Sequence, residues 1–295
     1  MKMSGAKMVI ESLHQEGVEV VFGYPGGAIM NVYDEIYKQN YFEHILNRHE
    51  QACVIAAEGY ARSTGKTGVA IVTSGPGFTN AITGIADAYM DSIPVVIISG
   101  QVPTTIIGTD GFQEIDAVGI SRPCTKHNYL VNKIEDLPRI IKEAFHLAST
   151  GRPGPVHVDI PKDITAQIGE FIYPSEVNMP TYKPTINYNK RQLKKAMEAI
   201  SNAKKPLLYI GGGAILSNCG YEIRDLAKKL NIPAVETLMA RGVMGDENPL
   251  FFGMLGMHGC YSANMAMSEA DLMIAFGPRF DDRVTGKLSE FAKHA

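Results

Sequence analysis

Apolar positions along the first 165 residues alternate between the spacing of strands and the spacing of helices. Apolar and β-branched runs predict strands at 18–22, 44–46, 68–73, 94–99 and 156–160. Helical spacing predicts helices at 28–37, 50–61, 79–90 and 135–148, after a first helical face at Met8, Val9 and Leu13. This alternation indicates a parallel sheet covered by helices on both faces. Ligands of such sheets bind outside the carboxyl ends of the strands, so the segments after strands should carry the chemistry.

A second α/β pattern follows a stretch without periodicity. Residues 166–189 are polar and punctuated by prolines, which predicts a linker between a first domain at 1–165 and a second at 190–295. Elements are predicted in the second domain at 191–201, 206–210, 221–230, 232–236 and 272–276. Residues 289–295 read as the middle of a helix with no strand after it. The fold class expected is α/β, with two doubly wound parallel-sheet domains of which the second is incomplete.

Composition narrows the class of protein. The 295 residues are 45% hydrophobic, enough to bury sizeable cores. Since 28 basic and 31 acidic residues leave a net charge of -3, a nucleic-acid or membrane-surface binder is not expected. No apolar run approaches the roughly 18 residues of a membrane span. The four cysteines form no CxxC pair, which argues against disulfide frameworks and zinc knuckles and favours a cytoplasmic location.

Two glycine-containing loops follow predicted strands. Residues 23–28 read Gly-Tyr-Pro-Gly-Gly-Ala, and paired glycines let a ligand approach the backbone and leave N–H groups at a helix N-terminus. A simple tight turn explains this segment equally well. Residues 74–80 have the same placement, with Pro76 stiffening the loop and Asn80 presenting an amide from the first helical turn. Two such loops at one sheet edge favour a ligand site.

Glu50 is the most specific single candidate. It begins a helix after a short strand and is followed by small residues at 52, 56 and 57. A carboxylic acid that faces an apolar pocket can exchange a proton with a bound heterocycle near neutral pH. The alternative is a surface residue that interacts with the helix dipole.

Several motifs occur in a fixed order along the chain: residues 24–27, 49–51, 74–80, 100–103, 112–114 and 151–155. They resemble the pyrimidine-binding domain of thiamine-diphosphate enzymes. The strings at 255–259 (Leu-Gly-Met-His-Gly) and 279–286 (Arg-Phe-Asp-Asp-Arg-Val-Thr-Gly) narrow the resemblance to the catalytic subunits of the acetolactate synthase family. The resemblance covers the whole chain.

The resemblance implies roles for residues of the first domain. Glu50 would hydrogen-bond N1′ of the aminopyrimidine of thiamine diphosphate and control its proton. Gly27 would allow close approach near the reacting carbon, and Gln113 would lie beside the reacting carbons. Further cofactor contacts are implied for Tyr24, Pro76 and Asn80, and substrate-channel positions for Phe112 and Lys162. Without the resemblance, Lys162 reads as a solvated loop residue.

Bound FAD, needed structurally without net redox, is also implied. Its contacts would be Arg152, Gly211, Gly212, Gly213, Thr237, Leu238, Met239, Met257, His258, Gly277, Arg279, Asp281, Asp282 and Arg283. A triple-glycine turn after a strand suits a diphosphate, and the two arginines near the end can form forked hydrogen bonds to anionic groups. For His258 alone, a packed or capping role is the alternative.

The implied reaction joins a two-carbon unit from pyruvate, carried on thiamine diphosphate, to pyruvate or 2-oxobutyrate. The products are acetolactate or acetohydroxybutyrate, in branched-chain (isoleucine and valine) biosynthesis. The family holds the diphosphate through Mg²⁺ with a Gly-Asp-Gly turn, which is absent here; the nearest string is Gly-Asp-Glu at 245–247. No metal ligand is therefore assigned, and we expect a fragment that lacks a C-terminal domain and is inactive alone. A homodimer or dimer of dimers and a small regulatory subunit are implied partners.

Two other functions stay open. One is another thiamine-diphosphate carboligase or a pyruvate oxidase, against which the 279–286 string argues. The other is a non-catalytic FAD-binding remnant, against which the presence of both Glu50 and Gln113 argues.

Overall fold

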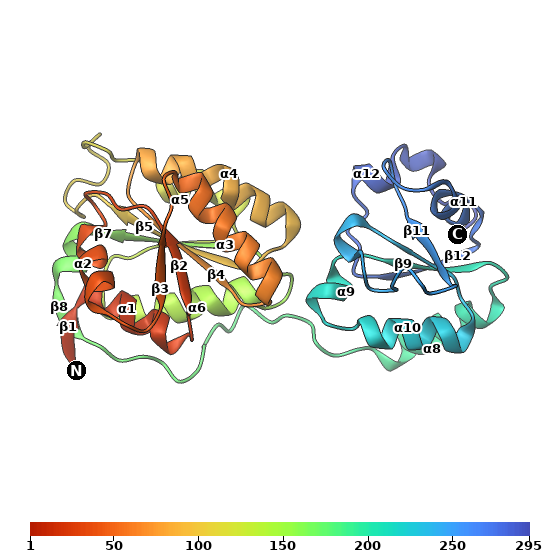
Figure 1. Cartoon of the computed structure of the whole chain (residues 1–295). Coiled ribbons are helices and arrows are strands. Elements are labelled where there is room, and N and C mark those ends of the chain that lie inside the picture. The colour runs from red at the N-terminus through yellow and green to blue at the C-terminus, as the bar shows by residue number, and fades with distance from the viewer. The chain divides into compact units, whose positions relative to one another are not determined.

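The computed structural model describes residues 1–295 and divides the chain into two compact units, Met1–Thr185 and Ile186–Ala295 (Figure 1). Both are α/β, as predicted. None of the helices combines the length and the apolar character that crossing a membrane requires.

The first unit is built on a six-stranded sheet in which every neighbouring pair of strands is parallel. In spatial order its strands are β3 (Glu43–Leu46), β2 (Val20–Gly23), β4 (Gly68–Val72), β5 (Val95–Gln101), β7 (Val156–Pro161) and β6 (His127–Leu130). The predicted strands of this unit are confirmed. The edge strand β6 was not predicted, because its residues are polar or only half buried.

Helices cover both faces of this sheet, as Figure 1 shows. One face carries α1 (Gly5–Gln15), α2 (Met30–Lys38), α6 (Leu137–Ser149) and α7 (Lys162–Ala166); the other carries α3 (Glu50–Thr64), α4 (Pro76–Asp91) and α5 (Ala117–Ser121), and two 3-10 turns lie at Arg122–Cys124 and Ile134–Asp136. Successive side chains of β4 point to opposite faces, so Val69 and Ile71 join one core while Ala70 and Val72 join the other. Burial on both faces explains why β4 has no polar side chain along its length.

Much of the segment 166–189, predicted as a linker, packs against the first unit. Strand β8 (Ile168–Glu170) pairs antiparallel with β1 (Lys2–Ser4). The amide of Phe171 donates to the carbonyl of Met1 at 2.8 Å, and the hydroxyl of Tyr182 donates to the carbonyl of Thr150 at 2.8 Å. The first unit therefore extends to Thr185, because backbone pairing and aromatic contacts hold a stretch whose composition alone reads as polar.

The second unit has a four-stranded parallel sheet between two helical layers. Its strands, in spatial order, are β11 (Phe251–Met254), β10 (Ala234–Glu236), β9 (Pro206–Ile210) and β12 (Leu272–Phe276). Its helices are α8 (Lys190–Asn202), α9 (Gly213–Leu216), α10 (Gly220–Leu230), α11 (Tyr261–Glu269) and α12 (Asp282–Thr285), with 3-10 turns at Leu238–Ala240 and Leu288–Glu290. The latter turn replaces the helix read at the end of the sequence. Strand β11 and helix α11 were not predicted.

Candidate active site

The order of strands in the first unit locates the point at which the direction of winding reverses. From β2 the chain moves to β3 on one side and then to β4 on the other, so the direction of winding reverses between β2 and β4. Ligands of doubly wound sheets bind at this reversal, outside the carboxyl ends of the strands. The two glycine-containing loops, predicted at 23–28 and 74–80, follow β2 and β4, and residues 76–80 form the first turns of α4.

Glu50 is buried at this edge. It is the first residue of α3 and only 6% exposed, so the interpretation as a solvated surface residue is wrong. Asn80 Nδ2, in the first turns of α4, donates a 2.9 Å hydrogen bond to Glu50 Oε2. Gly77 keeps the other oxygen accessible, because a Cβ at that position would lie 3.2 Å from Glu50 Oε1. The carboxylate is thereby held by one partner and keeps its second oxygen for another.

Two neighbours of Glu50 are buried groups with shifted pKa values. Burial, with a smaller contribution from the charge of Glu50, raises the pKa of the Cys53 thiol to about 12. Burial likewise raises the pKa of the Tyr33 hydroxyl, with the charges of Cys53 and Glu50 adding to the effect. Neither neighbour therefore ionises near neutral pH.

Thr73 organises the two loops and was missed by the sequence analysis. Its side chain would lie 2.5 Å from a Cβ at Gly26 and 2.6 Å from one at Gly77, and its Oγ1 accepts a 3.4 Å hydrogen bond from the amide of Ala28. Both glycines are therefore required by packing against Thr73. Its position at the end of a predicted strand, directly before a glycine-containing loop, was the available signal.

The first loop leaves room for a ligand. A Cβ on Gly27 would meet no atom within 4 Å, and Tyr24 is 38% exposed. Helix α2 begins at Met30, two residues later than predicted, and the amide of Ala28 is already bonded to Thr73. This loop therefore provides open space for a ligand at Gly27 and does not provide a row of free backbone amides.

The loop 102–116, between β5 and α5, carries two further predicted residues. Phe112 is 89% exposed, and Gln113 has a φ of 59°. The backbone of Gln113 lies on Gly75, whose own φ is 55° and where a Cβ would lie 2.7 Å from the Gln113 carbonyl carbon. Gly75 precedes Pro76, the exposed first residue of α4. Gln113 is thereby brought to the start of the helix whose first turns also carry Asn80.

The other two predicted residues of this unit lie at the two ends of β7. Lys162 is exposed at the start of α7, after the carboxyl end of β7. Arg152 precedes β7 and so lies at the opposite edge of the sheet. Its Nε donates to Ser92 Oγ at 2.7 Å, beyond the end of α4. The structure therefore does not bring Arg152 to Glu50.

In the second unit, the predicted flavin residues gather at the carboxyl ends of its strands. The turn 211–213 packs on the segment after β12, where a Cβ at Gly213 would lie 2.7 Å from Gly277 Cα. Gly212 lies against Met239, where a Cβ would approach the Met239 Cβ to 3.0 Å. The amides of Gly211 and Gly213 donate to the carbonyls of Phe276 and Gly277, so these two are not available to a diphosphate. Close packing is thus the main role of the glycines.

The segments 255–258 and 279–283 also meet. The amide of Met257 donates to the carbonyl of Arg283 at 2.7 Å. Asp281 caps α12 through a 3.0 Å bond from the Arg283 amide, and its other oxygen lies 3.4 Å from Arg279 Nε. Asp282 and His258 are exposed beside them. Thr237 Oγ1 is buried without a hydrogen-bond partner, whereas Leu238 is 72% exposed.

Two family models match the chain. Residues 3–120 match the thiamine pyrophosphate enzyme, N-terminal TPP binding domain, and residues 193–295 match the thiamine pyrophosphate enzyme, central domain. The acetolactate synthase large subunit of Haemophilus influenzae is 54% identical over 296 residues, which cover 100% of this chain.

The chain belongs to the thiamine pyrophosphate enzymes.

Other relatives agree with this family. The large subunit of acetolactate synthase isozyme 3 from Escherichia coli is 51% identical over 99% of the chain, and an acetolactate synthase from Mycobacterium leprae is 51% identical over 100%. The aligned region covers 52%, 51% and 47% of these three proteins. The chain thus spans about half the length of the curated relatives it matches.

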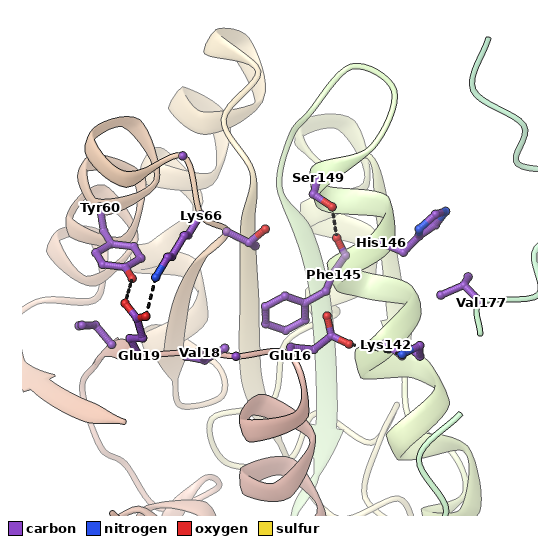
Figure 2. A pocket seen from close by; sticks show the side chains of 14 residues that line it. Glu16, Val18, Glu19, Tyr60, Lys66, Lys142, Phe145, His146, Ser149 and Val177 are labelled. Atoms are coloured by element: carbon purple, nitrogen blue, oxygen red, sulfur yellow. Dashed lines mark hydrogen bonds and ion pairs between the residues drawn. The ribbon is translucent and has the colours of Figure 1, made fainter. Parts of the chain in front are cut away.

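A cavity of about 570 Å³ in this thiamine pyrophosphate enzyme lies away from Glu50 (Figure 2). It is lined by residues that precede β2 and β4, at the amino ends of those strands, and by one face of α6. Its charged groups are already paired: Lys66 Nζ lies 2.5 Å from Glu19 Oε1, and Lys142 Nζ lies 3.9 Å from Glu16 Oε1. With its charges satisfied internally, this cavity is not the candidate site.

Proposed function

We propose that the whole protein is an acetolactate synthase, which condenses a two-carbon unit from pyruvate with pyruvate or 2-oxobutyrate. The single observation that carries this proposal is the buried Glu50, held by Asn80 at the open edge beside Gly27. The identity of 51–54% to acetolactate synthases along the whole chain supports the choice of reaction.

The residues of the first unit fit the aminopyrimidine of thiamine diphosphate. When bound, this cofactor supplies the electron sink for decarboxylation of a 2-keto acid. Glu50 would exchange a proton with the pyrimidine nitrogen N1′, and Asn80 would keep the carboxylate oriented toward it. The absence of a side chain at Gly27 leaves space for the cofactor near its reacting carbon. Phe112, Gln113 and Lys162 would contact the 2-keto acids.

We also propose FAD as a second cofactor, bound by the second unit at the carboxyl ends of its strands. Two features of these residues support the binding of FAD. The buried hydroxyl of Thr237 has no partner within the chain, and glycines bring three loops together. Arg279 and Arg283, in the segment that follows β12, would pair with anionic groups of the cofactor. A flavin contact for Arg152, implied by the family resemblance, is part of the same proposal.

No Mg²⁺ ligand is assigned within these 295 residues. No group of three or more His, Cys, Asp or Glu side chains is arranged to hold a metal ion. Because the sequence also lacks the Gly-Asp-Gly turn of the family, we propose that the diphosphate and its Mg²⁺ are bound by residues outside these 295. Two copies of the protein, a small regulatory subunit and a cytoplasmic location, all implied by the family resemblance, are part of the same proposal.

The test is product analysis with the full-length protein. Pyruvate, thiamine diphosphate and Mg²⁺ should give acetolactate and CO2, and added 2-oxobutyrate should give acetohydroxybutyrate. Omitting thiamine diphosphate should abolish both products. Acetate or acetyl phosphate formed with consumption of oxygen would instead identify a pyruvate oxidase and overturn the proposal.

A further inference from the structure

The loop 102–116 is held at both ends by side chains that no role assigned so far explains. It has three residues with positive φ, Gly108, Asp110 and Gln113, and much of its surface is exposed. A loop of this kind needs fixed points to present a side chain at one position. The contacts of its two ends supply them.

Asp163 fixes the beginning of the loop. Its Oδ1 accepts a 3.0 Å hydrogen bond from the Thr104 amide, and its Oδ2 accepts a 2.6 Å bond from the Thr104 hydroxyl. These bonds lower the pKa of Asp163, although its partial burial acts in the opposite direction. Asp163 follows Lys162 directly, so the same bonds tie the loop to the start of α7.

Gln101 fixes the end of the loop. Its Nε2 donates to the carbonyl of Ile115 at 3.0 Å and to Asp159 Oδ2 at 2.9 Å, while its Oε1 accepts from the amide of Val102 at 2.8 Å. Every polar atom of this amide is used, and its orientation is fixed because the Ile115 carbonyl requires a donor and the Val102 amide requires an acceptor. Asp159 is itself held by Ser99 Oγ at 2.6 Å.

Between these two points the loop is folded on itself and on α4. Glu114 accepts hydrogen bonds from the amides of Gly108 and Gly111, the latter at 2.9 Å, and these bonds lower its pKa. The backbone of the adjacent Gln113 rests on Gly75, where no side chain fits. The backbone of Gln113 is thus held at Gly75 between two fixed points of the loop.

We propose that Asp163 and Gln101 are positioning residues, which hold the ends of the 102–116 loop so that Gln113 stays on Gly75 at the edge where Glu50 lies. The proposal rests on the proposed function, because it assigns to Gln113 a place beside the reacting carbons. Neither residue contacts substrate; both act through Gln113.

The test compares Asp163→Ala, Asp163→Asn and Glu135→Ala in the full-length holoenzyme. Glu135 is an exposed carboxylate of the same unit outside the loop, so its variant is the charge-matched control. Asp163→Asn retains an acceptor for the Thr104 amide. The first readout is hydrogen exchange of the loop amides, which should be about tenfold faster in Asp163→Ala and unchanged in the other two variants.

The second readout is kcat for acetolactate formation. Asp163→Ala should lower kcat about 10- to 100-fold with a smaller change in KM, and Asp163→Asn should restore most of it. In a Gln113→Ala background, Asp163→Ala should change kcat by no more than about twofold, because the group it positions is gone. Gln101→Leu should have the same effects on loop exchange and kcat as Asp163→Ala. Because Gln101→Leu also removes a hydrogen-bond donor from buried Asp159, the positioning role is judged from the Asp163 variants.

Three results would overturn the positioning role: unchanged loop exchange in Asp163→Ala, unchanged kcat despite faster exchange, or losses that multiply in the double variant with Gln113→Ala. Failure of the proposed function is distinguishable. In that case the wild-type protein forms no acetolactate from pyruvate, whereas the exchange rates still report whether Asp163 holds the loop.

Discussion

Asn80 Nδ2 lies 2.9 Å from Glu50 Oε2, which joins the first turns of α4 to the first residue of α3. The two residues are thirty positions apart and meet because α3 and α4 pack side by side on the same face of the sheet. The bond orients a buried carboxylate without neutralising it. A group that must exchange a proton at one fixed atom requires this combination.

Replacing Glu50 by Gln should abolish most activity of the full-length enzyme. The amide has nearly the same shape and keeps an oxygen for Asn80 but cannot transfer a proton, so kcat should fall by about 100- to 10,000-fold. Steady-state assays with pyruvate measure this change. Glu43→Gln, at an exposed position in β3, is the matched control and should retain full activity. Activity within tenfold of wild type would show that Glu50 is not the proton-exchanging group.

Gly27→Ala should weaken cofactor binding without changing the stability of the protein. Because a Cβ at Gly27 meets no atom of the chain within 4 Å, the free energy of unfolding should change by less than about 0.5 kcal/mol. The methyl group fills space proposed for the cofactor, so the affinity for thiamine diphosphate, measured by titration of activity, should fall. Gly59→Ala, which also points into open space but lies within α3, is the control and should leave this affinity unchanged. Equal affinities for both variants would place the cofactor elsewhere.

The buried pair Asp159 and His157 should make opposite contributions to the pH dependence of stability. Burial raises the pKa of Asp159 to about 7 and lowers the pKa of His157 to about 3. Ser99 Oγ joins them, at 2.6 Å from Asp159 Oδ1 and 2.7 Å from His157 Nε2.

Between pH values of about 4 and 7, the folded state holds a proton on Asp159 that the unfolded chain releases. This contribution to the free energy of unfolding therefore falls as pH rises. Between about 3 and 6.5, the unfolded chain binds a proton on His157 that the folded state excludes, so that contribution rises with pH. The two slopes cancel over the range that they share.

Asp159→Asn should uncover the contribution of His157. From pH 4.5 to 6, its free energy of unfolding, measured with urea, should increase with pH more steeply than that of wild type, by about 1.4 kcal/mol per pH unit. Asp110→Asn, an exposed carboxylate of the same unit, should keep the wild-type slope. A slope for Asp159→Asn equal to that of wild type would mean that Asp159 is ionised in the folded state throughout this range.

Glu236→Gln should destabilise the second unit. Glu236 is fully buried at the end of β10, and its two oxygens accept hydrogen bonds from the amides of Gly242, at 3.2 Å, and Met244, at 2.5 Å. An amide group turns one acceptor into a donor that faces a backbone N–H, which should cost about 1–3 kcal/mol of unfolding free energy. Retention of FAD during gel filtration should fall in parallel, since Thr237 follows directly. Exposed Glu247→Gln is the control, and equal stability of the two variants would count against this account.

The strands and helices that were predicted correctly are those whose bounds depend on neighbouring residues in the sequence. Strand β12 was predicted at its observed bounds because a run of five apolar residues, Leu272–Phe276, is flanked by polar and glycine residues. Strand β11 was not, because Gly253 interrupts it and Phe252 is exposed at the sheet edge. The first domain was predicted to end at residue 165 rather than at Thr185. The sequence did not reveal the later boundary because the pairing of β8 with β1 joins residues about 166 positions apart.

For the site, the sequence alone pointed to Glu50, to the two glycine-containing loops and, through the order of motifs, to the family, because each is a property of neighbouring residues. Only the tertiary structure decided that Glu50 is buried rather than exposed, that Thr73 requires the glycines around it, and that Asp163 holds Thr104. These relationships depend on which loops the strand order places side by side. That placement determines the burial and the hydrogen bonding between distant segments, and the local spacing of residues along the chain does not determine it.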